Sequence, residues 1–85
     1  MKYIIVQSGG CETPILFTEL MDHCQVAGGL KVVSAGFVSI GTKRVDTGIG
    51  GYEELECTAY GKSVSLNLSS RPDEDTRLIT RAIQN

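Results

Sequence analysis

The chain has 85 residues, of which 21% are charged, and a formal net charge of −2. This length suits one domain with one small core, and the composition is that of a folded chain, so intrinsic disorder is excluded. Eight basic against ten acidic side chains are too balanced for a protein that binds nucleic acid through the phosphate backbone. A homodimer is a further hypothesis, because self-association would let so short a chain bury more surface.

The chain begins with Met-Lys-Tyr-Ile-Ile-Val, and this apolar run is short because Gln7 and Ser8 follow it. The first six residues predict a strand, with no signal peptide and no membrane span, and therefore a cytoplasmic protein. The three cysteines, Cys11, Cys24 and Cys57, form an odd set without a CxxC motif, which predicts free thiols in a reducing compartment. With a single histidine, the chain lacks the ligand spacing of a structural metal site.

Two extended segments open the chain. Residues 2–7 are rich in β-branched and aromatic side chains, and residues 13–17 follow a Ser-Gly-Gly-Cys turn. This pattern predicts a first hairpin. Because Pro14 cannot donate a ladder hydrogen bond, the second strand should lie at a sheet edge.

A helix is predicted over residues 18–27, ended by Gly28-Gly29. Its proposed core-facing stripe has helical spacing and consists of Phe17, Leu20, Met21 and Cys24. His23 lies on this helix, and we expect it to be exposed or to serve as a cap. Adjacent helical residues point about 100° apart, so His23 and Cys24 do not form a catalytic pair.

Residues 31–40 predict a third strand that is apolar on both alternating faces. Such a strand is usually central, and we expect a helix to cover one face and a partner chain the other. Gly36 in its middle predicts a bulge or the close approach of another backbone. The glycine-rich segment 41–53 then predicts a mobile connection, with Lys43 and Arg44 as candidate contacts.

The strongest local pattern is the strict alternation in residues 54–60 and 63–69 around Gly61-Lys62. It predicts a hairpin with a type II′ turn, in which Ala59 faces Val64 on the buried side. Tyr60, Ser63 and Ser65 then belong to a polar outer row. The Gly-Lys-Ser sequence is no P-loop, because the upstream glycine and the following helix are missing.

The chain ends in a predicted amphipathic helix that begins near Pro72, with acidic residues in its first turn. Its apolar stripe consists of Leu78, Ile79, Ala82 and Ile83. Helix capping is favoured over anion binding for residues 69–71. The whole pattern predicts an α+β fold in ββαβββα order, with an antiparallel sheet of about four to five strands, a short helix and a C-terminal amphipathic helix.

The runs VVSAGFVSI at 32–40 and AYGKSVSLNLSSRPDED at 59–75 resemble short hypothetical proteins encoded by bacteriophages and prophages. The resemblance covers most of the chain, with 41–53 as an insertion. It implies a phage or mobile-element origin and carries over no activity, cofactor or site residue.

Three hypotheses of function follow. The favoured one is a non-enzymatic accessory protein that binds a host or defence protein through an edge strand or residues 41–53. The second is an oligomeric nucleotide-type binder with Lys43, Arg44 and Arg71 around a shared pocket, and the third is a small enzyme that uses Cys or His. No cofactor, metal or catalytic residue is predicted. The candidate contact residues are Lys43, Arg44, Arg71, Tyr60, Ser63 and Ser65.

Overall fold

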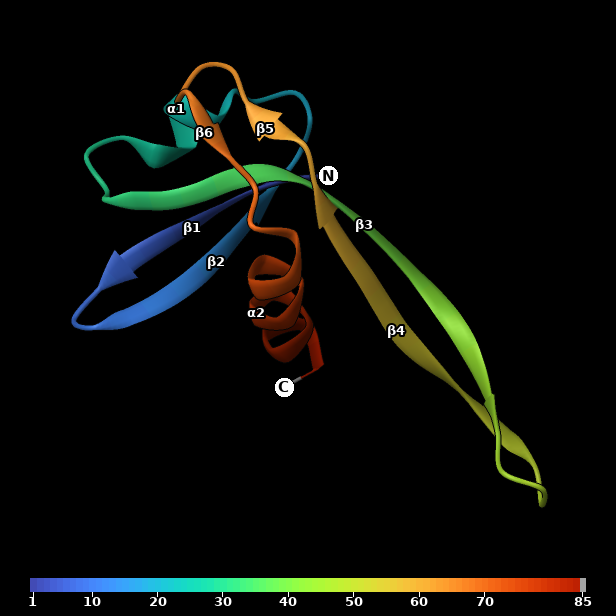
Figure 1. Ribbon diagram of the computed structural model, residues 1–85. Helices are drawn as coiled ribbons and strands as arrows, with labels where there is room; N and C mark the ends of the chain where they lie inside the picture. The colour runs from blue at the N-terminus through green and yellow to red at the C-terminus, as the bar shows by residue number, and fades with distance from the viewer. Residues whose placement is uncertain (85) are drawn as a thin grey trace.

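The computed structural model describes residues 1–84, which adopt the predicted α+β architecture (Figure 1). The elements in chain order are β1 (Lys2–Ser8), β2 (Cys11–Phe17), α1 (His23–Ala27), β3 (Val32–Asp46), β4 (Gly51–Tyr60), β5 (Lys62–Ser63), β6 (Leu68–Ser69) and α2 (Pro72–Gln84). Four strands form one antiparallel sheet in the order β2-β1-β3-β4, and β5 and β6 form a second, small sheet.

The first hairpin is confirmed. Strands β1 and β2 pair from Lys2 opposite Phe17 to Ser8 opposite Cys11. Strand β2 lies at the edge of the sheet, as Pro14 predicted. Strand β3 is central, because β1 pairs with its first half and β4 with its second half.

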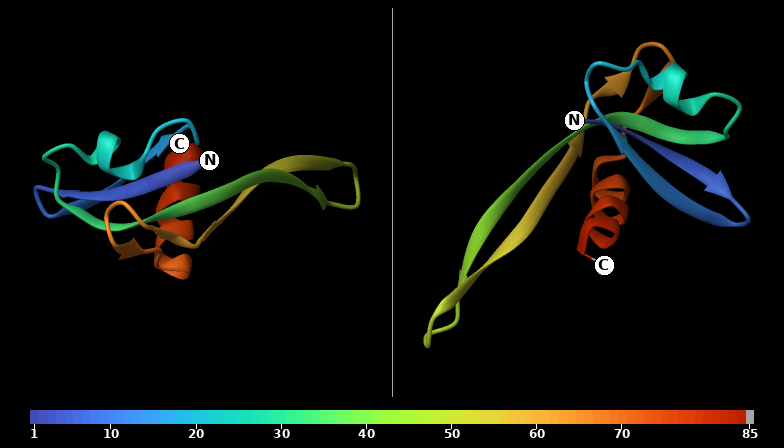
Figure 2. Two further views of the ribbon diagram at one scale, coloured as in Figure 1. Left: turned by 90° about the horizontal axis from the view of Figure 1, so that it is seen from above. Right: turned by 180° about the vertical axis from the view of Figure 1, so that it is seen from behind.

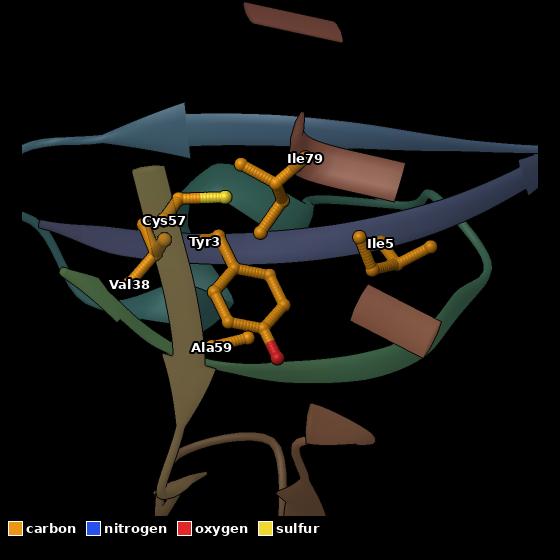
Figure 3. Close-up of a cluster of buried hydrophobic side chains, with 6 residues drawn as sticks. All are labelled: Tyr3, Ile5, Val38, Cys57, Ala59 and Ile79. Atoms are coloured by element: carbon orange, nitrogen blue, oxygen red, sulfur yellow. The ribbon is translucent and has the colours of Figure 1, made fainter. Parts of the chain in front are cut away.

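Each face of the sheet is covered by the chain itself. Helix α2 places Ile79 on one face, where the buried cluster consists of Tyr3, Ile5, Val38, Cys57, Ala59 and Ile79 (Figure 3). The other face carries Ile4, Val6, Phe17, Ala27 and Ala35, with Leu66 and Leu68 packed against them. Elements of the same chain therefore cover both apolar faces of residues 31–40. A partner chain is not needed to explain why both faces are apolar.

The pairing of β3 with β4 continues far beyond this body. It runs to Asp46 opposite Gly51, and the molecule measures 50 × 28 × 18 Å along its principal axes. We call residues 41–56 the arm. In every view the arm leaves the body as a two-stranded ribbon (Figure 2).

The structure places residues 41–46 in β3 and 51–53 in β4, so the connection predicted over 41–53 is reduced to the tip of the arm. Lys43 lies opposite Glu54 and Arg44 opposite Glu53, so opposite charges meet across the ladder. At the tip, the Thr47 amide and hydroxyl both donate to the Gly50 carbonyl oxygen at 2.9 Å. The glycines that suggested a loop are concentrated at this tip, while β-forming side chains fill the strands.

The predicted hairpin about Gly61-Lys62 is wrong. Strand β4 pairs with β3, so that Ala59 faces Val38 rather than Val64. Lys62 pairs instead with Ser69 in the short β5–β6 sheet. Alternation specifies which side chains share a face, but it does not specify the partner strand, and β3 offers the longer ladder.

The first helix is shorter than predicted, since α1 covers only His23–Ala27. Phe17 belongs to β2, and Leu20 is 95% exposed, so the proposed stripe does not form. The Thr18 hydroxyl accepts a hydrogen bond from the Leu20 amide, which stabilises a turn where the helix was expected. Helix α2 begins at Pro72 and buries Ile79 as predicted.

The prediction for Gly36 is confirmed as a close approach of backbone. A Cβ atom at this position would lie 2.5 Å from the carbonyl oxygen of Tyr60. This contact holds the end of β4 against the middle of β3 and brings Tyr60 beside Phe37.

Candidate functional site

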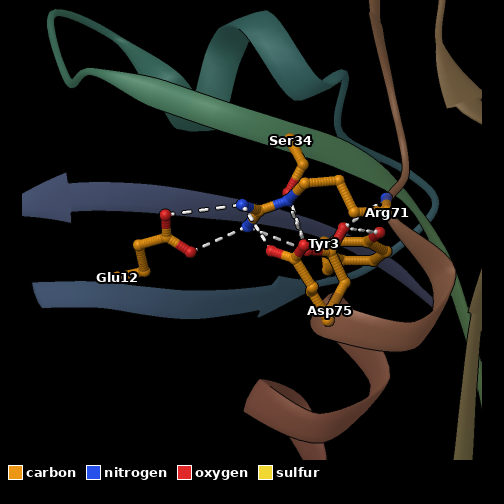
Figure 4. A network of polar contacts seen from close by, with 6 residues as sticks. Tyr3, Glu12, Ser34, Arg71 and Asp75 are labelled. Atoms are coloured by element: carbon orange, nitrogen blue, oxygen red, sulfur yellow. Dashed lines mark hydrogen bonds and ion pairs between the residues drawn. The ribbon is translucent and has the colours of Figure 1, made fainter.

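A buried polar network joins α2 to the sheet (Figure 4). Asp75 is fully buried and accepts hydrogen bonds from the Tyr3 hydroxyl at 2.5 Å, the Ser34 hydroxyl at 2.9 Å and the Arg71 amide at 2.9 Å. Burial raises the pKa of Tyr3 well above its ordinary range, and the bond to Asp75 raises it further. The network therefore fixes how α2 sits on the sheet.

Arg71, a predicted contact residue, belongs to this network. Its guanidinium lies 2.9 Å from Glu12, 3.1 Å from Glu74 and 3.0 Å from Asp75. The hydrogen bond with Glu12 is the main cause that raises the pKa of Arg71, against the opposing effect of burial. Because three carboxylates surround the Arg71 guanidinium, its charge is already paired within the fold, which disfavours binding of an anionic ligand.

A cleft of about 680 Å³ lies on the other side of the sheet, between the start of α1 and the segment that follows β4. Its floor contains the stacked rings of Phe37 and Tyr60, whose centroids are 5.8 Å apart with an interplanar angle of 24°. The remaining walls come from Lys2, Asp22, His23, Gly61, Lys62, Val64 and Ser65.

His23 is buried, which corrects the prediction of an exposed or capping residue. Its Nε2 atom lies 2.8 Å from the Gly36 carbonyl oxygen. The rings of Phe17 and Phe37 lie nearly perpendicular to its ring, with centroid distances of 5.4 Å and 5.8 Å. His23 and Ala27 lie four residues apart and are the buried residues of α1, so they form its inward face, whereas the predicted stripe had placed Leu20 and Cys24 there.

The predicted contact residues divide among three places. Tyr60 and Ser65 line the cleft, and the hydroxyl of the buried Ser63 lies 3.4 Å from that of Ser65. Lys43 and Arg44 lie on the arm, and Arg71 lies in the Asp75 network. No single site of this chain therefore gathers Lys43, Arg44 and Arg71 among residues 1–84.

Sequence reasoning missed His23, Phe37 and Lys2 as lining residues. Lys2 donates to the Met21 carbonyl oxygen at 2.9 Å and lies 3.9 Å from Asp22. The cleft joins residues far apart in the sequence, because the ladder places Lys2 opposite Phe37 and Phe37 opposite Tyr60. No local pattern could have found them.

The cysteines are free thiols, as predicted. Cys11 and Cys24 are exposed, while the buried Cys57 sulfur lies 2.9 Å from the Thr80 hydroxyl. Within the part of the chain that the structure describes, no group of three or more His, Cys, Asp or Glu residues could hold a metal ion. Neither helix in residues 1–84 has the length and apolar character needed to cross a membrane.

The arm is the other candidate surface. Of its residues only Val45 and Glu54 are half-buried, and the rest are exposed. The exposed fractions are 99% for Ile49, 54% for Tyr52 and 42% for Leu55, and Ile40 at its base is 40% exposed. The arm thus presents large apolar side chains without a covering element.

Comparisons of the chain with protein-family models, with curated proteins and with solved structures found no match.

Proposed function

We propose that this chain is a non-enzymatic binding protein that engages a protein partner through the arm. The observation that carries the proposal is the exposure of Ile49, Tyr52 and Leu55 on a two-stranded ribbon that projects from a well-covered body. Two strands alone are marginally stable in water, and exposed apolar side chains stand at the tip of this ribbon and on each of its two faces. Such a ribbon becomes fully ordered and covered when a partner packs on it.

The hydrogen-bonding edges of the arm support the same proposal. Strand β4 is the last strand of the sheet, so no further strand pairs with its outer edge among residues 1–84. An extended segment of a partner could add to this edge by backbone hydrogen bonds, with specificity from alternate side chains.

The charge of the arm supports one chemistry for that partner. The arm contains two basic and four acidic side chains, whereas the rest of the chain contains six of each. The whole formal net charge of −2 therefore lies on the arm. A partner segment that combines apolar and basic side chains would match it, and the complementary charge would also speed association.

The resemblance to phage-encoded proteins makes a host or defence protein the partner class to test first. Affinity capture from bacterial lysate would compare the full chain with the double variant Tyr52→Ser/Leu55→Ser. The matched control is Leu20→Ser/Leu30→Ser, since both leucines are exposed and lie outside the arm and the cleft.

We expect one protein to be recovered by the full chain and by the control, and to be lost from the arm variant. Equal recovery with the arm variant would place the binding surface elsewhere and overturn the proposal. Failure to recover any protein with the full chain from lysates of suitable hosts would also count against it.

A further inference from the structure

The cleft over Phe37 and Tyr60 has no part in the proposed function, because its walls lie in the body and not in the arm. Its volume of about 680 Å³ falls within the range of about 300–1,000 Å³ that is usual for small-molecule sites. A suitable volume alone does not identify a binding site. Three features of the cleft walls indicate the chemistry of the ligand.

The first feature is an unused hydrogen-bonding atom on His23. A carbonyl oxygen only accepts, so His23 Nε2 must donate its proton to the Gly36 oxygen at 2.8 Å. The other ring nitrogen, Nδ1, has no hydrogen-bond partner among residues 1–84. In the imidazole form, this nitrogen is an acceptor.

The position of His23 Nδ1 follows from the burial of its residue. Only 4% of His23 is exposed, yet no fully buried side-chain nitrogen or oxygen in the described chain lacks a partner. Nδ1 therefore keeps some accessible surface, and we infer that it opens to the cleft, because His23 lines the cleft. The two perpendicular phenylalanine rings and the hydrogen bond to Gly36 hold the His23 ring in this orientation.

The second feature is the aromatic floor. Phe37 and Tyr60 stack on each other, and half of Tyr60 remains exposed. Flat π-systems bury large area against such rings and gain from offset stacking. Val64, which is 84% exposed, extends this apolar surface at the rim.

The third feature is an unbalanced positive charge. Lys2 and Asp22 lie 3.9 Å apart and offset each other. Lys62, the other ammonium group of the cleft, has no carboxylate within ion-pair distance in the described part of the chain. The cleft thus combines an apolar floor with one cation at its mouth.

We propose that the cleft binds a flat aromatic compound that carries one anionic group and donates one hydrogen bond to Nδ1 of His23. The aromatic body rests on Tyr60 and Phe37, and the anionic group faces Lys62. The volume of about 680 Å³ is large enough for a bicyclic aromatic acid.

The chain has one histidine, so untagged protein gives a single set of imidazole NMR signals that report on the cleft. Three compounds test the three features on the unmodified chain. Indole-5-carboxylate has the ring, the N–H donor and the charge; naphthalene-2-carboxylate lacks the donor; indole lacks the charge. We expect the first to shift the His23 and Tyr60 ring signals saturably, and the other two to bind more weakly.

Two variants and one control then assign the contacts. Lys62→Gln should weaken indole-5-carboxylate about fivefold, as expected for one exposed charge contact. Tyr60→Ala should weaken it about tenfold through lost stacking. Lys43→Gln, a matched charge removal on the arm, should leave the affinity unchanged, and backbone amide spectra verify that each variant is folded.

The proposal is overturned if the His23 signals of the folded wild-type chain do not move up to the solubility limit of indole-5-carboxylate. Equal affinity for indole would remove the anion from the proposed ligand class. Equal affinity for naphthalene-2-carboxylate would remove the bond to His23. None of these outcomes depends on the arm, so they leave the proposed protein partner untouched.

Discussion

Strands β3 and β4 run through both the body and the arm, yet different forces hold their two ends. On one face of β3, Val38 is 2% exposed, whereas Ile40, two residues further on, is 40% exposed. Opposite Ile40, the Cys57 sulfur contacts Thr76 and Thr80 of α2, and beyond this pair every residue of the arm (Figure 1) is exposed or half-buried. Burial stabilises the body, while backbone pairing and cross-strand side chains alone hold the arm.

Charge divides the molecule at the same boundary. Six basic and six acidic side chains balance in the body, and the excess of acidic residues lies on the arm. Charged side chains on open strands oppose edge-to-edge aggregation. The arm therefore combines apolar residues that favour a partner with charges that disfavour its own copies, which is what a surface for one specific partner requires.

The largest effect should follow from removing the central carboxylate of the body. Asp75→Ala leaves the hydroxyls of Tyr3 and Ser34 without their acceptor in the interior. Breaking a buried charged network costs about 3–5 kcal/mol, a large share of the stability of a small domain. Urea denaturation should show this loss.

The matched control is Asp73→Ala, an exposed acid in the same first turn of α2. It should cost less than about 1 kcal/mol, because only the favourable interaction with the helix dipole is lost. Similar losses in the two variants would mean that the Asp75 network does not stabilise the body more than any acid at this helix terminus.

A methyl group added in the body and in the arm gives the next contrast. At Gly36 the new Cβ would lie 2.5 Å from the Tyr60 carbonyl oxygen, while at Gly41 nothing lies within 4 Å. Gly36→Ala should therefore cost about 1–3 kcal/mol, because backbone must shift. Gly41→Ala should change the unfolding free energy by less than about 1 kcal/mol. Equal effects would contradict the close packing of β4 on β3.

The third effect concerns pH. The pKa of Tyr3 is raised in the folded state, so the folded chain holds this proton more tightly than the unfolded chain. The stability that Tyr3 contributes is fully present below the ordinary tyrosine pKa of about 10. Above that pH, the unfolding free energy falls by about 1.4 kcal/mol per pH unit.

Urea denaturation of the wild type and Tyr3→Phe from about pH 7 to about pH 11 would measure this contribution, since other titrating groups are common to both. At neutral pH the variant should be less stable by about 1–2 kcal/mol, because Asp75 loses a donor. The difference should shrink above about pH 10. Parallel curves would show that Tyr3 keeps its proton equally well in both states.

Much of the body could be predicted from local sequence. The β1–β2 hairpin and α2 each depend on residues close in the chain, namely the Gly9-Gly10 turn and the helical stripe around Ile79. The partner of β4 could not be predicted in this way. Residues 54–60 alternate as well for pairing with 63–69 as with β3, and only the tertiary ladder decides between them.

The cleft was predictable only in part. Tyr60 and Ser65 were recognised as polar outer residues of a hairpin that does not form, so they were found for a wrong reason. His23 was missed because its burial depends on the exact start of α1 and on Phe17 and Phe37 from two different strands. The position of helix ends is where local patterns are weakest.

Removing most of the arm should have the smallest effect on stability. This variant tests the contrast between the body and the arm most directly. In the ladder Thr42 faces Leu55, so replacing residues 43–54 by Asn-Gly closes the same two strands with a two-residue turn. The replaced segment contains no buried side chain, and ordering its backbone opposes folding by about 1–2 kcal/mol per residue, which offsets its cross-strand pairs. The unfolding free energy should therefore stay within about 1 kcal/mol of the wild type, and amide hydrogen exchange should be faster in the arm than in β1. A loss of several kcal/mol would mean that the body depends on the arm, and the arm could then no longer be interpreted as a surface held in place for a partner.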